Sequence, residues 1–120
     1  MTEEERRARL EQALHYGGDT HALGDVAQAL KYGVAQWWQH EDGMIVTEVQ
    51  NYPRVKAIHY WLIAGRLSDC QVLQPRIDAW AIEQGCHVAT AMGRPGWLRA
   101  GGEGWRVVGH SFAKDLRNGR

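Results

Sequence analysis

Residues 80–97 read WAIEQGCHVATAMGRPGW, and this stretch decides the fold class. A helix containing Trp80 ends at Gly85, since glycine readily takes the left-handed backbone found at helix C-termini. Residues 86–91 then have strand composition, and Pro95 suits the first turn of a further short helix. A strand reached through a helical crossover pairs in parallel with a neighbouring strand, and the connection is right-handed. The stretch therefore predicts the second half of an α/β unit.

Upstream of this stretch, the pattern predicts two helices. Thr2, with Glu5 three residues later, is typical of a capping box and begins a helix that reaches Leu14. A second helix begins at Thr20 or His21 and runs to residue 32, because its apolar residues recur three and four apart. These helices form an N-terminal part, residues 1–33.

Three strands follow the helices. Residues 34–40 and 44–50 are rich in strand-forming side chains, and Asp42-Gly43 between them is typical of a two-residue hairpin turn. Residues 55–64, VKAIHYWLIA, are apolar enough for a central strand. The sequence thus predicts an antiparallel meander before the crossover helix.

The crossover helix has Ser68 as its predicted N-cap and Gly85 as its stop. Pro75 leaves two alternatives open: a kinked helix, or a short turn before a helix that starts near Gln74. Residues 106–112, RVVGHSF, are predicted to form a last strand. The expected fold is an α+β mixed sheet with the order α-α-β-β-β-α-β-α(short)-β. We expect one domain over 1–120, with sheet and crossover helices in 34–116 and a polar tail in 117–120.

Composition excludes several classes of protein. The chain has 120 residues, 14 Lys and Arg against 14 Asp and Glu, and no net charge, so it lacks the basic surplus typical of nucleic-acid binding. The two cysteines, Cys70 and Cys86, have neither disulfide-framework nor metal-ligand spacing, so we expect reduced thiols and no metal. The start MTEEERRARLEQ has no apolar signal region, and no 18-residue apolar run occurs. We expect a protein that is not secreted and has no membrane segment.

The six tryptophans are spread along the chain. A small domain gains stability from burying such large side chains, so most of them are expected in the core. The neighbouring pair Trp37 and Trp38 cannot place both rings on one face of a strand. The alternative is that one of these two rings is exposed to a partner or ligand.

The predicted order resembles the GNAT superfamily of acetyl-CoA-dependent acyltransferases over residues 34–116. The runs TEVQNYPRVKAIHYWLIAG, IDAWAIEQGC and GRPGW and the ending KDL further resemble small bacteriophage GNAT-like proteins. Some members of that group are similar to internal virion proteins of short-tailed phages. The resemblance implies a GNAT-like fold, and it implies either an acetyltransferase or a virion-associated protein.

In GNAT enzymes a glycine-containing turn after the central strand lets backbone N–H groups at a helix start face the pyrophosphate of coenzyme A. The matching residues here are GRLSDC, residues 65–70, in which both small-residue positions are replaced. Asp69 would place a carboxylate where two phosphates must bind. We therefore expect no cofactor; if acetyl-CoA does bind, Arg66 and Ser68 are the candidate contacts.

A GNAT enzyme also needs a base for the amine and an acid, often a tyrosine, for the leaving thiolate. The corresponding region, GRPGWLRAGGEGW, has no tyrosine. Glu48 and His59 lie on strands predicted to pair and are the candidate catalytic residues if the protein is active. The alternative is that Glu48 faces solvent and His59 is a hydrogen-bonded sheet residue.

The GRPGW turn contains two candidate binding residues, Arg94 and Trp97. Arg94, beside a cleft between the separating strands, would bind an anion or a partner carboxylate. The structural alternative is that Trp97 fills the core and Arg94 pairs with a nearby carboxylate or stacks on an indole.

Two functions stay open at this point. The first is a noncatalytic GNAT-like phage protein, located in the virion or the host cytoplasm, whose partners are other virion or assembly proteins or further copies of itself. The second is an active acetyl-CoA-dependent N-acetyltransferase with an atypical cofactor loop. The missing glycine turn and the missing tyrosine favour the first.

Overall fold

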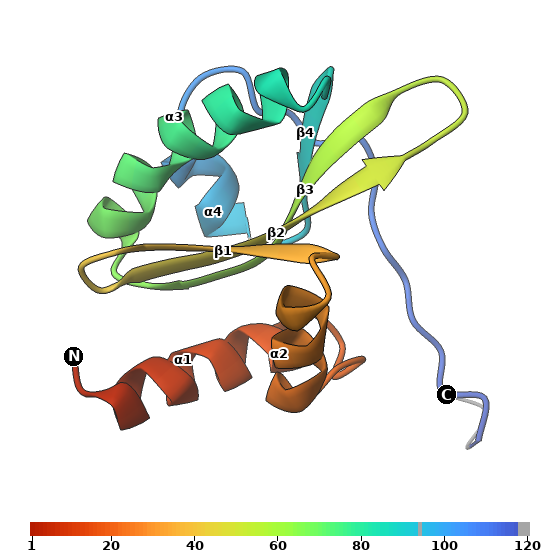
Figure 1. Ribbon diagram of the computed structural model, residues 1–120. Coiled ribbons are helices and arrows are strands. Elements are labelled where there is room, and N and C mark those ends of the chain that lie inside the picture. The colour runs from red at the N-terminus through yellow and green to blue at the C-terminus, as the bar shows by residue number, and fades with distance from the viewer. Residues whose placement is uncertain (94, 118–120) are drawn as a thin grey trace.

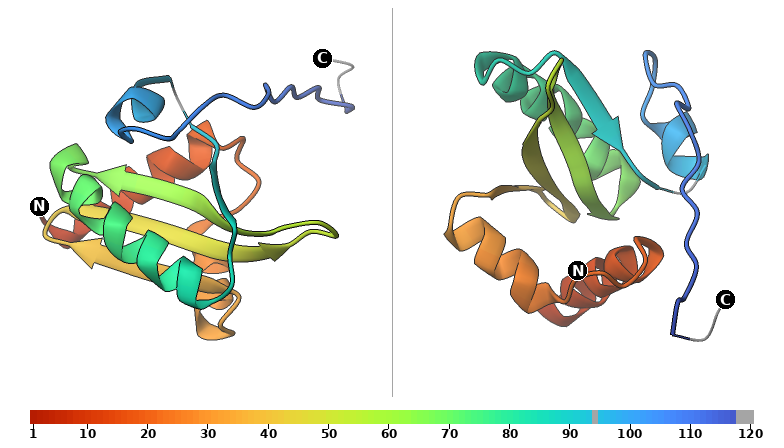
Figure 2. Two further views of the ribbon diagram at one scale, coloured as in Figure 1. Left: turned by 90° about the horizontal axis from the view of Figure 1, so that it is seen from above. Right: turned by 90° about the vertical axis from the view of Figure 1, so that its right-hand side faces the viewer.

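The computed structural model describes residues 1–93 and 95–117. It contains a mixed sheet with helices on both faces (Figure 1). The helices are α1 (Glu3–Tyr16), α2 (Leu23–Lys31), α3 (Leu67–Glu83) and α4 (Pro95–Ala100), and the strands are β1 (Ala35–His40), β2 (Gly43–Asn51), β3 (Lys56–Gly65) and β4 (Val88–Ala91). α1 and α2 cover one face, and α3 covers the other (Figures 1 and 2). The predicted α+β mixed sheet is confirmed.

The first two helices begin where side chains satisfy their free N–H groups. Thr2 Oγ1 accepts a hydrogen bond from the Glu5 N–H at 3.1 Å, as predicted. α2 begins later than predicted, because the Asp25 carboxylate accepts from the Ala22 N–H at 2.8 Å and makes Ala22 the N-cap. The Thr20 hydroxyl bonds to the His21 ring instead.

The sheet has the strand order β1-β2-β3-β4, with three antiparallel strands and β4 parallel to β3. The hairpin turn between β1 and β2 consists of Glu41 and Asp42, one residue earlier than predicted, since Gly43 already pairs with His40. Glu41 takes the left-handed conformation that the turn needs, at φ 49°. β3 is the central strand expected from the sequence, with β2 on one side and β4 on the other.

Two hydrophobic cores lie on the two faces of the sheet. Between β2 and β3, Val46 pairs with Leu62 while Thr47 pairs with Tyr60, so Trp61 is an extra, unpaired residue. The core on the α3 face comprises Ile45, Ile58, Tyr60, Cys70, Leu73, Ile77 and Ala81. The core on the α1 and α2 face comprises Leu14, Val26, Ala35, Val46 and Leu62.

Most tryptophans pack against one of these cores. Trp38, Trp80 and Trp105 pack against the α3-side core, and Trp61 packs against the other. The Trp38 indole N–H donates to Thr47 Oγ1 at 3.0 Å. Trp37 is 41% exposed, so one ring of the Trp37-Trp38 pair does face solvent.

α3 is continuous, so the alternative of a helix starting near Gln74 is wrong. Pro75 lies inside it on the exposed side. The predicted N-cap, Ser68, lies in the first turn, and Arg66 is the N-cap. The helix starts early because Gly65, at φ 92°, turns the chain immediately after β3.

The predicted last strand is wrong. Residues 106–112 form no strand, and Val107, Val108 and Phe112 are 58%, 82% and 92% exposed. The order therefore ends at α4. β-branched residues favour a strand only where a neighbouring strand and a core are present, and here the segment after α4 runs away from the sheet (Figure 2). None of the helices in the described part of the chain is long and apolar enough to cross a membrane.

Candidate functional site

The start of α3 is joined to the β1–β2 hairpin by a reciprocal pair of hydrogen bonds. The Arg66 N–H donates to the Asp42 carbonyl oxygen at 2.9 Å. The Asp42 N–H donates to the Asp69 carboxylate at 3.2 Å. Asp69 is the third residue of α3, where a carboxylate is stabilised by the helix dipole.

The two segments are in direct backbone contact. A Cβ at Gly43 would lie 2.6 Å from the Cys70 amide nitrogen, and a Cβ at Gly65 would lie 1.9 Å from the Asp42 carbonyl oxygen. Only glycine fits at either position. The hairpin turn is thus packed tightly against the first turn of α3.

The Asp42 carboxylate is surrounded by positive groups. The Met1 ammonium lies 3.2 Å away, Arg6 lies 3.4 Å away and Arg66 lies 3.9 Å away. The hydrogen bond from the Met1 ammonium is the largest cause that lowers the pKa of Asp42. Arg66, a candidate cofactor contact, is therefore partly engaged with Asp42, whereas Ser68 is exposed in the first turn of α3.

A second polar group lies on the face of the sheet that α1 and α2 cover. Glu48 on β2 pairs directly with His59 on β3, so the prediction that these segments pair is confirmed. His59 Nδ1 lies 2.8 Å from Thr90 Oγ1 on β4. Since Ile58 and Tyr60 belong to the α3-side core, His59 between them faces α1 and α2.

Burial lowers the pKa of His59, and the Glu48 charge partly opposes this effect. The row continues along β2, because Gln50 Nε2 lies 3.5 Å from Glu48 and the Tyr52 hydroxyl donates to Gln50. The neutral imidazole between Glu48 and Thr90 has the chemistry of a general base. The geometry also fits the alternative of a hydrogen-bonded sheet histidine.

β3 and β4 separate beyond this row. β4 pairs with β3 only from Ala57 to Tyr60, and β3 continues to Gly65 without a β4 partner. On the α3 side, Trp105 packs edge-on against Tyr60 at 5.7 Å between ring centroids. The Tyr60 hydroxyl donates to Asp78 at 2.6 Å, and burial is the largest cause that raises its pKa. This hydroxyl therefore faces away from His59.

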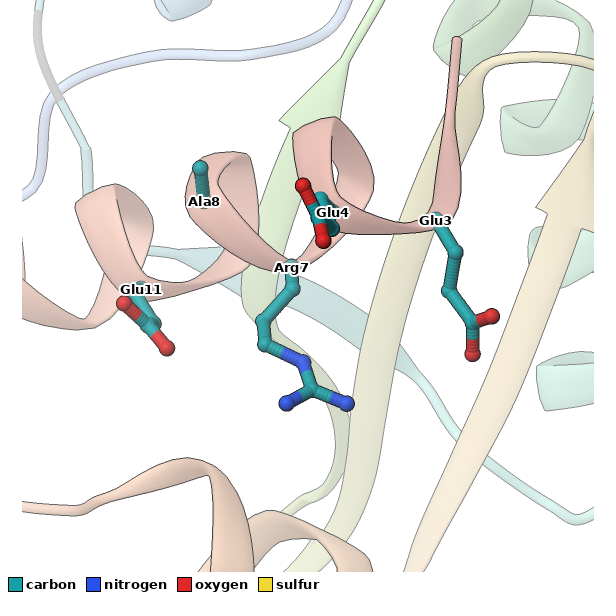
Figure 3. Close-up of a pocket in the computed structure, with 5 residues that line it drawn as sticks. All are labelled: Glu3, Glu4, Arg7, Ala8 and Glu11. Atoms are coloured by element: carbon teal, nitrogen blue, oxygen red, sulfur yellow. The ribbon is translucent and has the colours of Figure 1, made fainter.

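Hollows in the surface are shallow. One lies between α3 and the end of α4, where the Gln71 side chain donates to the Ala100 carbonyl at 2.9 Å. The other lies along the exposed side of α1, and Figure 3 shows its charged side chains extending from that helix alone. Its lining residues are Glu3, Glu4, Arg7, Ala8 and Glu11. In the described residues, no group of three or more His, Cys, Asp or Glu side chains is arranged to hold a metal ion.

The remaining predicted binding residues lie in the GRPGW turn. Arg94 lies outside the described residues. Trp97 is half-buried in α4, and a Cβ at Gly93 would lie 3.3 Å from its ring. Its carbonyl oxygen accepts from the Gly101 N–H at 2.9 Å, which ends the helix. These contacts fit the structural role of Trp97.

Sequence reasoning misses two residues of these groups. The pattern assigns Asp42 only to a turn, although the Asp-Gly pair and Gly65 together mark a close backbone approach. Nothing in the sequence marks Thr90, because its partner His59 is 31 residues away.

Solved structures share this fold. An acetyltransferase of Trypanosoma brucei matches with a TM-score of 0.63 and 14% identity, covering 96% of each chain. The protein TTHA1254 of Thermus thermophilus matches with a TM-score of 0.58 and 16% identity, covering 96% of this chain and 95% of that one. No protein-family model matches the sequence. No curated protein matches it either. The comparisons show a GNAT-like fold, and at this identity they show the fold alone.

Proposed function

We propose that this chain is a noncatalytic protein with a GNAT-like fold that acts through contacts with other proteins. One observation carries the proposal: the helix start at which a GNAT enzyme binds phosphates is here bonded to the hairpin. At this junction the Arg66 N–H donates to the Asp42 carbonyl, and the Asp42 N–H donates to the Asp69 carboxylate. The resemblance in fold to an acetyltransferase is compatible with either function.

The junction disfavours coenzyme A for an electrostatic reason. A pyrophosphate needs free N–H groups and a close backbone approach at the helix start. The Asp69 carboxylate lies in the first turn of this helix, where it accepts from the Asp42 N–H. Two like charges 4 Å apart near a protein surface repel by about 4 kcal/mol. Arg66, the nearest candidate cation, lies 3.9 Å from Asp42 and is already compensating that carboxylate.

His59 and its neighbour Tyr60 also point to opposite faces of the sheet. An acyl transfer needs a base for the amine and an acid for the thiolate on the same side of the bound cofactor. The hydroxyl of Tyr60, the tyrosine on the central strand, is buried against Asp78 on the α3 face. His59 faces α1 and α2, so the two groups cannot act on one substrate.

Calorimetric titration with coenzyme A, and separately with acetyl-CoA, tests the proposal. We expect no saturable heat with either ligand at ligand concentrations up to about 1 mM. Asp69→Asn, which keeps the shape of the side chain and removes its charge, is the matched variant. Saturable micromolar binding by the unmodified chain would overturn the proposal.

An N-acetyltransferase is the second candidate, because the Glu48–His59 pair lies beside the point where β3 and β4 separate. In that case Arg66 and Ser68 would contact acetyl-CoA. Turnover of an amine acceptor, lost in Glu48→Gln and His59→Gln but kept in Gln50→Glu, would support this function.

We place the protein-contact role in a bacteriophage particle or its assembly because of the sequence resemblance to small phage proteins. The partners would be other virion or assembly proteins. Mass spectrometry of purified particles would then detect this chain at a constant ratio to the capsid protein. Its recovery only from the cytoplasm of infected cells would refute the virion setting.

A further inference from the structure

The C-terminal arm, residues 106–117, has apolar side chains without a core. Val108 and Phe112 are 82% and 92% exposed, and they lie four residues apart, on one face of an extended segment. Among the described residues, 106–114 make no backbone hydrogen bond to the body. Figure 1 shows the arm running away from the sheet toward the C-terminus. Its sequence, RVVGHSF, nevertheless has strong strand propensity.

The sheet has an open edge that lacks the usual protection. β1 is the first strand in the order, and no strand in the described part of the chain pairs with its outer side. Its sequence, AQWWQH, contains no lysine, arginine, acid or proline, and the bulge lies between β2 and β3. Natural edge strands usually carry such features, because an unprotected edge pairs with other strands. Exposed Val34 and Trp37 lie at this edge.

Residues 106–112 cannot pair with the β1 edge of their own sheet. This segment starts after Trp105, which packs on Tyr60 of β3. A position outside β1 is three strand spacings away, roughly 14 Å, and α3 covers the face between them. Crossing 14 Å would use about four extended residues, which is more than half of the seven residues 106–112. This segment therefore cannot also run along β1 of its own sheet.

We propose that residues 106–112 of one chain add as an edge strand to β1 of a second copy. Each chain supplies one strand-forming segment without a sheet and one long, unprotected edge at β1. Reciprocal exchange between two copies satisfies both and closes with twofold symmetry. Val108 and Phe112 would cover the exposed ring of Trp37. β4 is the poorer acceptor, since it has only four residues and its chain turns into α4. This dimer is independent of whether coenzyme A binds.

Sedimentation equilibrium and light scattering of the full chain test the proposal. We expect a concentration-dependent dimer. Consecutive residues of a strand direct their N–H groups to opposite sides, so one of Val107→Pro and Val108→Pro removes a hydrogen bond to β1. In that variant the dissociation constant of the dimer should rise by about tenfold or more, and in the other variant it should rise less. Both positions are exposed in the single chain, so its thermal stability should be unchanged.

Trp37→Lys tests the acceptor edge, because a lysine there opposes strand addition. Val55→Lys is the matched control: Val55 is also 41% exposed but lies in the β2–β3 loop. We expect the dimer to dissociate in Trp37→Lys and to be unchanged in Val55→Lys. A chain that stays monomeric at hundreds of micromolar, or a dimer that survives both prolines, would overturn the proposal. A dimer lost with the prolines but kept with Trp37→Lys would overturn β1 as the acceptor.

Discussion

Gly43→Ala perturbs the contact between the hairpin and α3. The added Cβ would lie 2.6 Å from the Cys70 nitrogen and 2.7 Å from the Asp69 carbonyl carbon. Both are backbone atoms, so no side-chain rotation relieves the overlap, and the hairpin must move away from the helix. Overpacking costs about 1–3 kcal/mol, and the two hydrogen bonds through Asp42 contribute about 1 kcal/mol each. We expect the free energy of unfolding to fall by about 3–5 kcal/mol.

Urea unfolding followed by far-ultraviolet circular dichroism measures this loss. Gly24→Ala is the control, since a Cβ at Gly24 meets nothing within 4 Å and alanine favours a helix. This control should stabilise the protein by up to about 1 kcal/mol. If Gly43→Ala unfolds within about 0.5 kcal/mol of the unmodified chain, the hairpin is not packed on α3. The start of α3 would then be open to phosphates.

Further predictions concern three side chains. Tyr60→Phe removes the hydrogen bond to Asp78 and should cost about 2 kcal/mol in urea unfolding; an equal loss in an Asp78→Ala background would refute the pairing. His59 has a lowered pKa in the folded chain, so the unfolded chain binds more protons. Its contribution to stability is complete above the ordinary pKa of 6.5 and is lost as pH falls below that value toward the lowered pKa. Melting temperatures of His59→Gln should therefore depend less on pH between about 7 and 5. Trp97→Ala should cost about 1–2 kcal/mol, because the ring is half-buried; a loss above about 3 kcal/mol would place it in the core.

Local patterns in the sequence are sufficient for most elements. The cap at Thr2, the central strand over residues 55–64 and the helix start at Pro95 agree with the structure. Each depends on a short motif or on apolar character, which neighbouring residues determine. The prediction fails at residues 106–112, because a strand requires a second strand to pair with.

The candidate site shows the same division. That the strands of Glu48 and His59 pair follows from the predicted meander, since adjacent strands joined by a short loop are antiparallel, whereas the register that sets these two residues opposite each other comes from the structure. The junction of Asp42 with Asp69 joins residues 27 positions apart, and although glycines mark a close backbone approach, no local pattern identifies Asp69 as the partner. The sequence predicts Gly43 as a turn residue, although its role is to let the backbone of α3 approach.

Local signals are sufficient to predict the order of the elements through α4 and the central position of β3, because capping, periodicity and apolar runs act over a few residues. The packing of distant segments bonds the start of α3 to the hairpin and turns His59 and Tyr60 to opposite faces. It also leaves residues 106–114, among the described residues, without a strand partner. Each of these depends on segments far apart in the chain meeting at contact distance. Such meetings are set by the packing of the whole fold rather than by local preference.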